Sequence, residues 1–455
     1  MLISCENTAT DSVPLTARNF PKNIATIIEA NCLGSSCHSQ PTSLNDGLVL
    51  ASWEDMARGS HTLNDVIPYH ARLSQLFLHV NTDPSIATPA YPRMPLSRNA
   101  LSKDDQRAIF DWIESGAPDK DGHILYNGVE HFIYVANQGS DYVTFINADS
   151  HRLVGAVKFA QGFAPVYVTV SSDKSTYFAA SFGGIIKRFS RSSRVSNAEL
   201  ESELTPSEIL LLPDNSKGYI ANYPSALPTR FGAFDPAGMT MTKFIETDLI
   251  RGPKAFALSS DSKYLYIAGY DSDNILRIAT ANDSIVSNLR LNTTVPSPVP
   301  SNYQRQYAPA KLILTSDDSR LFVCSEDRQE VTVFDLRTDS IIARISTQLS
   351  PYGAALTSDG KELWVANTGS NSVSIIDAVL LQPLLTLDTI ASQPRSICFT
   401  PDGIYVYIAC QGLKGSSHHM GGPPPSSVIV IDRGTRKLIA TIELPTLSVS
   451  IAPGF

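Results

Sequence analysis

The sequence has no continuous apolar run of about 18 residues, the length that a membrane-spanning helix needs, so no transmembrane segment is predicted. Charge is also scarce, since Lys, Arg, Asp and Glu make up 18% of the 455 residues and the formal net charge is −8. No basic stripe interleaved with aromatic residues occurs, which excludes a nucleic-acid partner. Because no stretch is charged enough to stay unfolded, the length suits two or three folded domains.

Seven copies of one short pattern fill the chain after residue 127. Each copy is an aromatic residue, a hydrophobic residue and a small residue, and the copies begin 42 to 56 residues apart. Self-similarity at such a period is typical of folds whose units stack side by side. The copies begin at Tyr134, Tyr177, Tyr219, Tyr266, Phe322, Trp364 and Tyr407.

The residues around each copy predict a unit of four short antiparallel strands. Each copy after the first is preceded by a turn that contains Asp, and a proline stands eight residues before that Asp, where an inner strand would begin. Four strands in about 42 residues is the size of one β-propeller blade. The recurring prolines are Pro165, Pro206, Pro253, Pro309, Pro351 and Pro394.

The first blade has no inner strand before Tyr134, and the end of the chain supplies one. Residues 445–454 form an alternating run in which Pro445 lies eight residues before Pro453, as in the other copies. We therefore expect the C-terminal strand to be the innermost strand of the first blade. It would close the ring and remove the unpaired edges that an open stack leaves.

Two copies carry a longer signature, Tyr-Val-Ala-Asn-x-Gly at 134–139 and Trp-Val-Ala-Asn-Thr-Gly at 364–369. With this signature the chain resembles the YVTN-type seven-bladed β-propellers over residues 127–455. The resemblance implies a mainly β fold and says little about function, because one fold hosts many roles. Residues 292–307 and 412–427 add length between strands, and such insertions lie in loops at a propeller face, where partners bind.

Residues 19–120 do not follow the blade pattern and predict a small all-α domain. A helix over residues 21–30 is followed by Cys32, Cys37 and His38, and the last helix begins at Ser102 with an acidic residue three positions later. Met94 lies in a Met-Pro loop before that helix, which reads Ile-x-x-Trp-Ile-x-x-Gly-Ala at 109–117. This order of elements resembles a small c-type cytochrome.

The resemblance implies one covalently bound haem c. Cys32 and Cys37 would bind the haem vinyl groups, His38 would be the proximal iron ligand, and Met94 would be the sixth ligand. Four residues separate the two cysteines where the usual motif has two, so a local disulfide beside an ordinary surface histidine stays the alternative. The alternative sixth ligands are His61, His70 and His79.

The first residues, Leu-Ile-Ser-Cys ending at Cys5, resemble a bacterial lipobox, in which the cysteine is lipidated. An accidental match is the alternative. Residues 1–18 would then be a tether to the membrane. Because covalent haem attachment also requires export, both interpretations place the protein outside the cytoplasm. With the lipobox they predict an outer-membrane lipoprotein of the bacterial cell envelope.

Two weaker patterns predict binding sites on the propeller. Lys254, Lys311 and Arg395 come just after recurring prolines and predict a positive rim at one mouth of the central channel, for an anion or an acidic partner; solvated rim charge is the alternative. His418, His419 and Met420 predict a weak second metal site, since imidazole and thioether suit copper. A loop without a ligand is the alternative there.

A cytochrome c before a propeller also resembles the nitrite reductases that hold haem d in an eight-bladed propeller. Here Val166 stands where that family's proximal histidine would be, and seven blades are predicted, so haem-d chemistry is not expected. The propeller has too few histidines for the copper centre of nitrous oxide reduction, and no Ser-His-Asp set, carboxylate pair or phosphate-binding glycine loop stands out.

The sequence therefore favours an electron carrier or binding protein over an enzyme. The first hypothesis is c-type haem electron transfer, with the propeller docking a protein redox partner. The second is a non-catalytic lipoprotein scaffold whose N-terminal domain holds no haem. The third is a propeller oxidoreductase with its substrate over the central channel.

Overall fold

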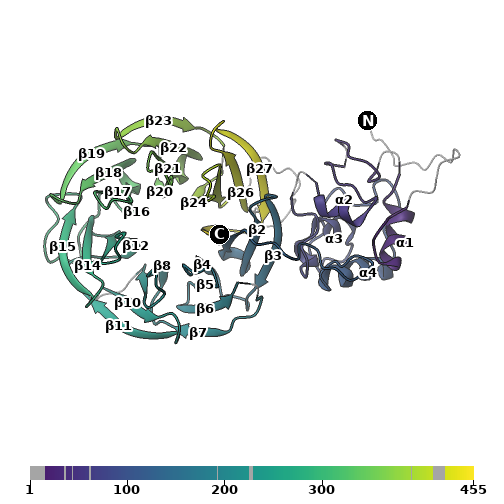
Figure 1. Cartoon of the computed structure of the whole chain (residues 1–455), viewed down its shortest axis with the longest axis horizontal. Coiled ribbons are helices and arrows are strands. Elements are labelled where there is room, and N and C mark those ends of the chain that lie inside the picture. The colour runs from purple at the N-terminus through teal and green to yellow at the C-terminus, as the bar shows by residue number, and fades with distance from the viewer. Residues whose placement is uncertain are drawn as a thin grey trace.

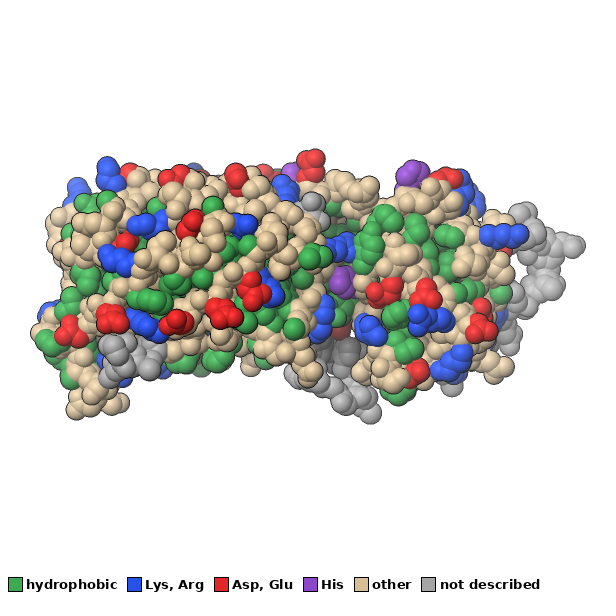
Figure 2. Space-filling model, turned by 90° about the horizontal axis from the view of Figure 1, so that it is seen from below, with side chains coloured by type: hydrophobic (Ala, Val, Ile, Leu, Met, Phe, Trp, Pro, Cys, Tyr) green, Lys and Arg blue, Asp and Glu red, His purple; other side chains and the backbone are tan. Residues whose placement is uncertain are grey.

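The computed structural model describes residues 16–34, 37–43, 45–60, 63–191, 193–224, 229–390, 392–412 and 426–455. A small helical domain lies beside a closed seven-bladed propeller (Figure 1). Seen from the side, the propeller is a flat disc and the helical domain a second, smaller lobe (Figure 2). No helix within the described ranges is both long and apolar enough to cross a membrane.

The helical domain packs around one hydrophobic core that contains Ile24, Ile28, Phe77, Trp112 and Ile113. Its last helix begins where the sequence predicts, because the Ser102 hydroxyl accepts a hydrogen bond from the backbone N–H of Asp105 at 3.0 Å. The helices are α1 (Lys22–Asn31), α2 (Trp53–Arg58), η1 (Ala71–Leu73), α3 (Gln75–Val80) and α4 (Lys103–Glu114).

The propeller consists of seven four-stranded antiparallel sheets, as predicted. Blade 1 is β28 (Ser448–Pro453), β1 (Phe132–Asn137), β2 (Tyr142–Asn147) and β3 (Arg152–Lys158). Blade 2 is β4 (Pro165–Val170), β5 (Thr176–Ser181), β6 (Ile185–Ser190) and β7 (Ala198–Glu201). Blade 3 is β8 (Pro206–Leu211), β9 (Gly218–Asn222), β10 (Arg230–Asp235) and β11 (Thr240–Glu246).

The remaining four blades repeat the same order from the channel outward. Blade 4 is β12 (Pro253–Leu258), β13 (Tyr264–Gly269), β14 (Asn274–Ala279) and β15 (Ser284–Arg290). Blade 5 is β16 (Pro309–Leu314), β17 (Arg320–Ser325), β18 (Glu330–Asp335) and β19 (Ser340–Ser346). Blade 6 is β20 (Pro351–Leu356), β21 (Glu362–Asn367), β22 (Ser372–Asp377) and β23 (Gln382–Leu387). Blade 7 is β24 (Pro394–Phe399), β25 (Tyr405–Cys410), β26 (Ser426–Asp432) and β27 (Lys437–Leu444).

The recurring residues have clear structural roles. Each recurring proline is the first residue of an inner strand, where the missing N–H costs no ladder hydrogen bond. The Asp of each turn holds the next strand, as where Asp359 accepts hydrogen bonds from the Thr357 hydroxyl at 2.6 Å and the Lys361 N–H at 3.1 Å. The aromatic motif lies on the second strand, where Tyr134 and Trp364 are buried.

β28 closes the ring as predicted, but its register differs from the predicted one. Asn137 at the end of β1 pairs with Ser448, whereas Asn367 at the same place in blade 6 pairs with Pro351. Ser448 therefore occupies the proline position, and assigning that position to Pro445 was wrong by three residues. In the second blade the aromatic motif begins one residue later than predicted. Pro165 pairs with Ser181 there, as Pro351 pairs with Asn367 in blade 6, and Phe178 then occupies the position of Trp364.

The exchange of proline for Ser448 gives the closing strand hydrogen bonds that the other inner strands lack. The Ser448 hydroxyl donates to Asn137 Oδ1 at 2.8 Å, and its N–H donates to the Ser426 hydroxyl at 2.9 Å. In blade 6, within the described part of the chain, Asn367 Oδ1 is buried and has no hydrogen-bond partner.

We expect Ser448→Ala to lower the free energy of unfolding by about 1–3 kcal/mol, because it leaves the buried Asn137 oxygen without its donor. Urea unfolding followed by circular dichroism measures this change. Leu447→Ala, at a neighbouring residue that is 43% exposed, is the matched control and should change stability little. Equal stability of Ser448→Ala and the control would contradict the assigned role.

Candidate functional site

The segment that carries the two cysteines leaves the end of α1 and folds back on itself. The Cys32 N–H donates to Ile28 O at 2.8 Å, and the His38 N–H donates to Cys32 O at 3.2 Å. Cys37 is held by a 3.0 Å hydrogen bond from its N–H to Gly34 O. These hydrogen bonds hold Cys37 and His38 close to the end of α1. Ser35 and Ser36 lie outside the described residues.

Both cysteines are half-buried, and this structure does not join them in the alternative disulfide. Burial raises the pKa of the Cys32 thiol to about 12, and the neighbouring Cys37 acts in the same direction. Cys32 also packs against the hydrophobic core of the helical domain. Cys32 therefore offers a neutral sulfur atom at the edge of an apolar core.

The His38 ring is oriented by the backbone. Its Nδ1 lies 3.0 Å from Leu48 O, and since a carbonyl oxygen can only accept, Nδ1 must carry the proton. Nε2 is then the nitrogen with a free lone pair, the arrangement that a metal-binding histidine requires. Burial lowers the pKa of His38, which keeps the ring neutral at pH 7.

Met94 lies on the same core as Cys32 and is tied to α3. Its N–H donates to His79 O at 2.8 Å, and its half-buried side chain packs against the core of the helical domain. After burial, the charge of His79 also lowers the pKa of His38. The backbone hydrogen bond places Met94 beside the alternative ligand His79.

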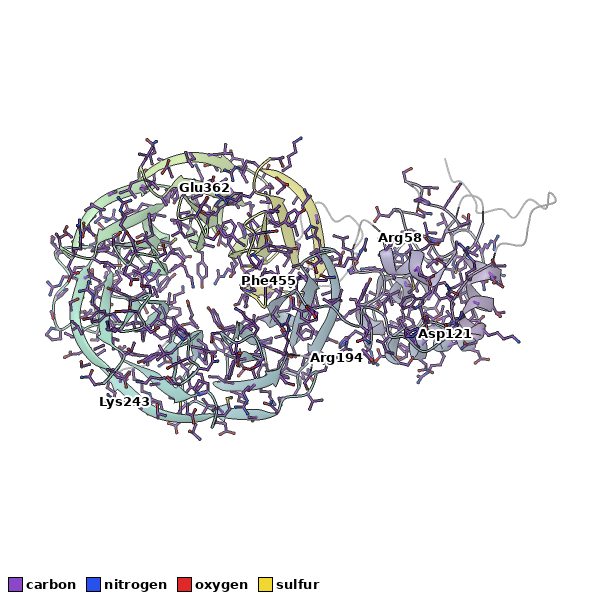
Figure 3. All side chains as sticks on the ribbon, in the orientation of Figure 1. Arg58, Asp121, Arg194, Lys243, Glu362 and Phe455 are labelled. Atoms are coloured by element: carbon purple, nitrogen blue, oxygen red, sulfur yellow. The ribbon has the colours of Figure 1, made fainter. Side chains whose placement is uncertain are left out.

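His70, another alternative sixth ligand, lies instead in the interface with the propeller. Its Nε2 is 2.7 Å from Ala156 O in β3. Beside it Ile67 is fully buried against a propeller core, and Arg194 stacks on the Tyr69 ring at 4.0 Å. Figure 3 shows Arg194 at the junction of the two domains. These contacts cover β3, which is buried along most of its length, whereas the outer strand β23 is largely exposed.

The structure brings two of the three predicted channel-mouth cations together. Lys254 Nζ lies 4.5 Å from the centre of the Tyr352 ring, and the Arg395 guanidinium lies 3.6 Å from the same centre. Lys311 is one residue further along its strand and forms an ion pair with Glu208 at 2.8 Å. The predicted residues Cys5, His61, His418, His419 and Met420 lie outside the described residues.

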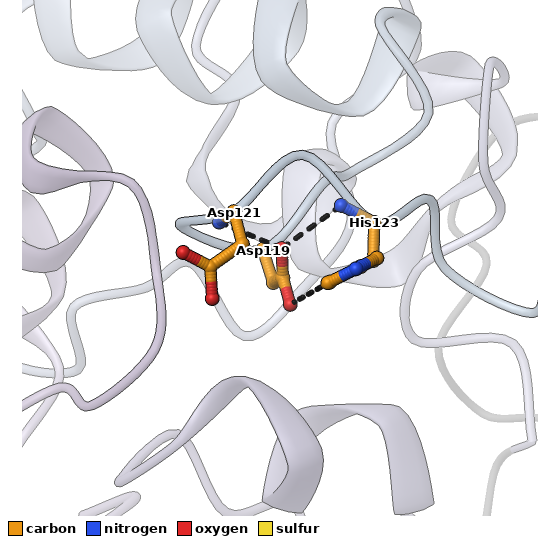
Figure 4. A group of neighbouring side chains, drawn as sticks. All are labelled: Asp119, Asp121 and His123. Atoms are coloured by element: carbon orange, nitrogen blue, oxygen red, sulfur yellow. Dashed lines mark hydrogen bonds and ion pairs between the residues drawn. The ribbon is translucent and has the colours of Figure 1, made fainter.

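A group of possible metal ligands that the sequence analysis missed follows α4. Asp119, Asp121 and His123 lie within one turn (Figure 4). Asp119 accepts hydrogen bonds from the backbone N–H groups of both other residues and from His123 Nδ1 at 2.9 Å, and this contact raises the pKa of His123. Asp121 pairs with Lys120 at 2.6 Å. The Asp-x-Asp-x-His spacing is visible in the sequence, but the hydrogen bonds of the turn to Asp119 already explain why the three side chains lie together.

Comparisons with known proteins support the propeller fold. No known protein family's profile matches the chain. The uncharacterized protein YncE of Salmonella typhimurium is 26% identical over 175 residues, which are 38% of this chain and 46% of YncE, and YncE of Salmonella typhi matches equally. The chain thus matches less than half the length of these curated relatives.

Three solved structures share the fold. A functionally unknown protein from Desulfotomaculum acetoxidans has a TM-score of 0.57 and 12% identity, covering 71% of this chain and 98% of that one. A putative 6-phosphogluconolactonase from Bacteroides uniformis has a TM-score of 0.55 and 16% identity, covering 71% and 99%. Kuenenia stuttgartiensis hydrazine synthase has a TM-score of 0.52 and 21% identity, covering 61% and 88%. At such identities the likeness concerns the fold alone.

The His70 contact predicts a pH dependence of the domain interface. Burial, aided by the charge of Arg194, lowers the pKa of His70 to about 4 from a usual 6.5. As the pH falls from about 6.5 to about 4, the unfolded chain therefore binds a proton that the folded protein does not, and the free energy of unfolding decreases.

His70→Gln keeps an N–H donor and removes the titration, so it should unfold with a smaller loss of stability over this pH range. Urea unfolding of both proteins at several pH values isolates the contribution of His70. The same pH slope in both proteins would contradict the assigned contact.

Proposed function

We propose that this protein is an exported redox protein that binds one c-type haem in its helical domain and docks a protein partner through its propeller. The observation that carries the proposal is the His38 ring, whose Nδ1–H is engaged by Leu48 O and whose Nε2 is left for a metal. It directly follows Cys37, and its N–H donates to Cys32 O, so the ring belongs to the segment that carries both cysteines. This donor set fits a covalently attached porphyrin iron.

Each residue would hold the group in a different way. Cys32 and Cys37 would carry the thioether links, His38 would be the proximal ligand and Met94 the sixth ligand. When bound, the haem supplies one-electron transfer through its iron. The chain's own contribution is to orient the His38 ring through Leu48 O and to exclude water with the apolar core that Cys32 and Met94 border.

The seven-bladed propeller fold fits a protein-interaction or scaffold role. In the proposal this role is to dock the electron donor or acceptor. The closely packed interface between the two domains at Ile67 and Arg194 would hold the haem domain at a fixed distance from that partner. Lipidation at Cys5 would place the assembly at the bacterial outer membrane.

A reduced-minus-oxidised spectrum tests the haem directly. Full-length protein produced with a cytochrome c maturation system should give a sharp reduced α-band and a haem stain that survives denaturing electrophoresis. Cys32→Ala and Cys37→Ala should each lose one covalent link, and the double variant should lose the stained band. Cys324→Ala, at a buried propeller cysteine, is the matched control and should keep the band.

Protein that matures without any covalent porphyrin would contradict the redox proposal. It would favour the second candidate, a haem-free scaffold, whose supporting observation is the propeller fold itself. A pull-down with the propeller domain would then be the next step.

The sixth ligand can be identified from the redox potential. Met94→His should lower the midpoint potential, because His/Met ligation gives a higher potential than two histidines. His79→Ala should leave the potential close to that of the wild type. The opposite result, with His79→Ala changing the potential and Met94→His leaving it unchanged, would assign the iron to His79.

A further inference from the structure

A second cluster lies far from the helical domain, where the inner strands begin. Three tyrosine rings surround the ammonium group of Lys254, which is 6% exposed. Its Nζ lies 3.4 Å from the ring centre of Tyr270, 4.5 Å from that of Tyr352 and 5.0 Å from that of Tyr223. We call Lys254, Arg395, Tyr270, Tyr352 and Glu326 the channel-mouth cluster.

The repeat geometry builds this cluster from distant parts of the chain. Lys254, Tyr352 and Arg395 each follow the first proline of an inner strand, so they lie at one level of the channel. Blade 5 lies between the blades of Lys254 and Tyr352 and has the small Ala310 at this level. Ala310 packs in one cluster with Tyr352 and leaves room for the Tyr352 ring to reach Lys254. Gly353 permits a close approach of β20 to β24, since a Cβ there would lie 2.1 Å from Arg395 O.

The insertion between blades 4 and 5 adds a third cation. Asp273 is fully buried and accepts hydrogen bonds from three consecutive backbone N–H groups, those of residues 306–308, at 2.5 to 3.0 Å. This anchor places Arg305 between Asp271 and Asp327, each at 3.0 Å, with its guanidinium 4.4 Å from the Tyr270 ring centre. The two carboxylates more than compensate the single charge of Arg305.

The charges of Lys254 and Arg395 are not balanced in the same way. Glu326 is the acid nearest to Lys254, at 4.0 Å, and it also accepts a 2.6 Å hydrogen bond from the Tyr270 hydroxyl. Within the described part of the chain, Arg395 has no carboxylate at ion-pair distance, and its guanidinium lies over the Tyr352 ring. The two cations on this ring thus have a single carboxylate at ion-pair distance, which leaves the half-buried guanidinium of Arg395 without an anion.

We propose that the channel mouth is a binding site for a small organic oxyanion, whose carboxylate or phosphate group lies between Lys254 and Arg395. The planar guanidinium of Arg395 matches either group with two hydrogen bonds, and the ammonium of Lys254 adds a point charge. The tyrosine rings offer apolar faces to the remainder of the ligand. The proposal is independent of the haem.

The site should respond to pH through Lys254. Burial lowers its pKa to about 7, with Arg395 and Arg305 acting in the same direction and Glu326 and Asp271 against it. A bound anion stabilises the protonated amine, so affinity should fall as the pH rises from about 6 to about 8. The other titratable groups around the amine are Tyr223, Tyr270 and Tyr352, whose pKa values burial raises.

Isothermal titration calorimetry of the full-length protein tests the site, with acetate, succinate and inorganic phosphate as separate probes at about pH 6. We expect saturable binding at one site for at least one probe, and the preferred probe distinguishes a carboxylate from a phosphate ligand. Arg395→Gln and Lys254→Met should each weaken binding by about tenfold or more. Lys361→Met, which removes an exposed lysine outside the channel-mouth cluster, is the matched control and should bind like the wild type.

Three results would overturn the proposal: no saturable binding of any probe, binding that Arg395→Gln leaves unchanged, or equal losses in Arg395→Gln and the control. Arg395 is half-buried and has no ion pair in the described residues, so its variant is expected to fold. If Lys254→Met does not fold, Arg395→Gln alone still tests the proposal. Affinity that rises with pH in the wild type would also count against it.

Discussion

The pairing of β28 with β1 is the constraint on which the rest of the structure depends. Seven blades radiate around the channel, and the first of them is complete only when the end of the chain returns to it. Closure fixes the inner strands at one level, so the residues that follow each inner-strand start lie at the same end of the channel. It also makes blade 1 the place where the first and last strands of the propeller pair, and the helical domain covers the outer strand of that blade (Figure 1).

The sequence predicted the number of blades, the proline starts of the inner strands and the closing strand, because these depend on local patterns repeated seven times. It assigned two positions to Pro445 and Tyr177 that Ser448 and Phe178 occupy, because strand register is set by hydrogen-bonding partners rather than by spacing. The Asn137 side chain shows the reason: it takes a hydroxyl donor from a strand 311 residues away. No local pattern carries that information.

The candidate sites were predictable to different degrees. The Cys32, Cys37 and His38 motif is contiguous, so the sequence places it, and the structure adds the orientation of the His38 ring by Leu48 O. The cation–tyrosine contacts of Lys254 could not be predicted, because Tyr352 reaches it across a blade whose residue at that level is small. The contact of His70 with Ala156 likewise joins two domains and leaves no trace in either segment alone.

The central claim is that Cys32 and Cys37 are attachment points for a haem, and the intact mass of the mature protein tests it most directly. Protein exported by a bacterium with cytochrome c maturation should exceed the mass of its polypeptide by one haem, and peptide mapping should find the added mass on the segment from Cys32 to His38. A mass equal to that of the polypeptide, with both cysteines open to alkylation or joined to each other, would contradict the account.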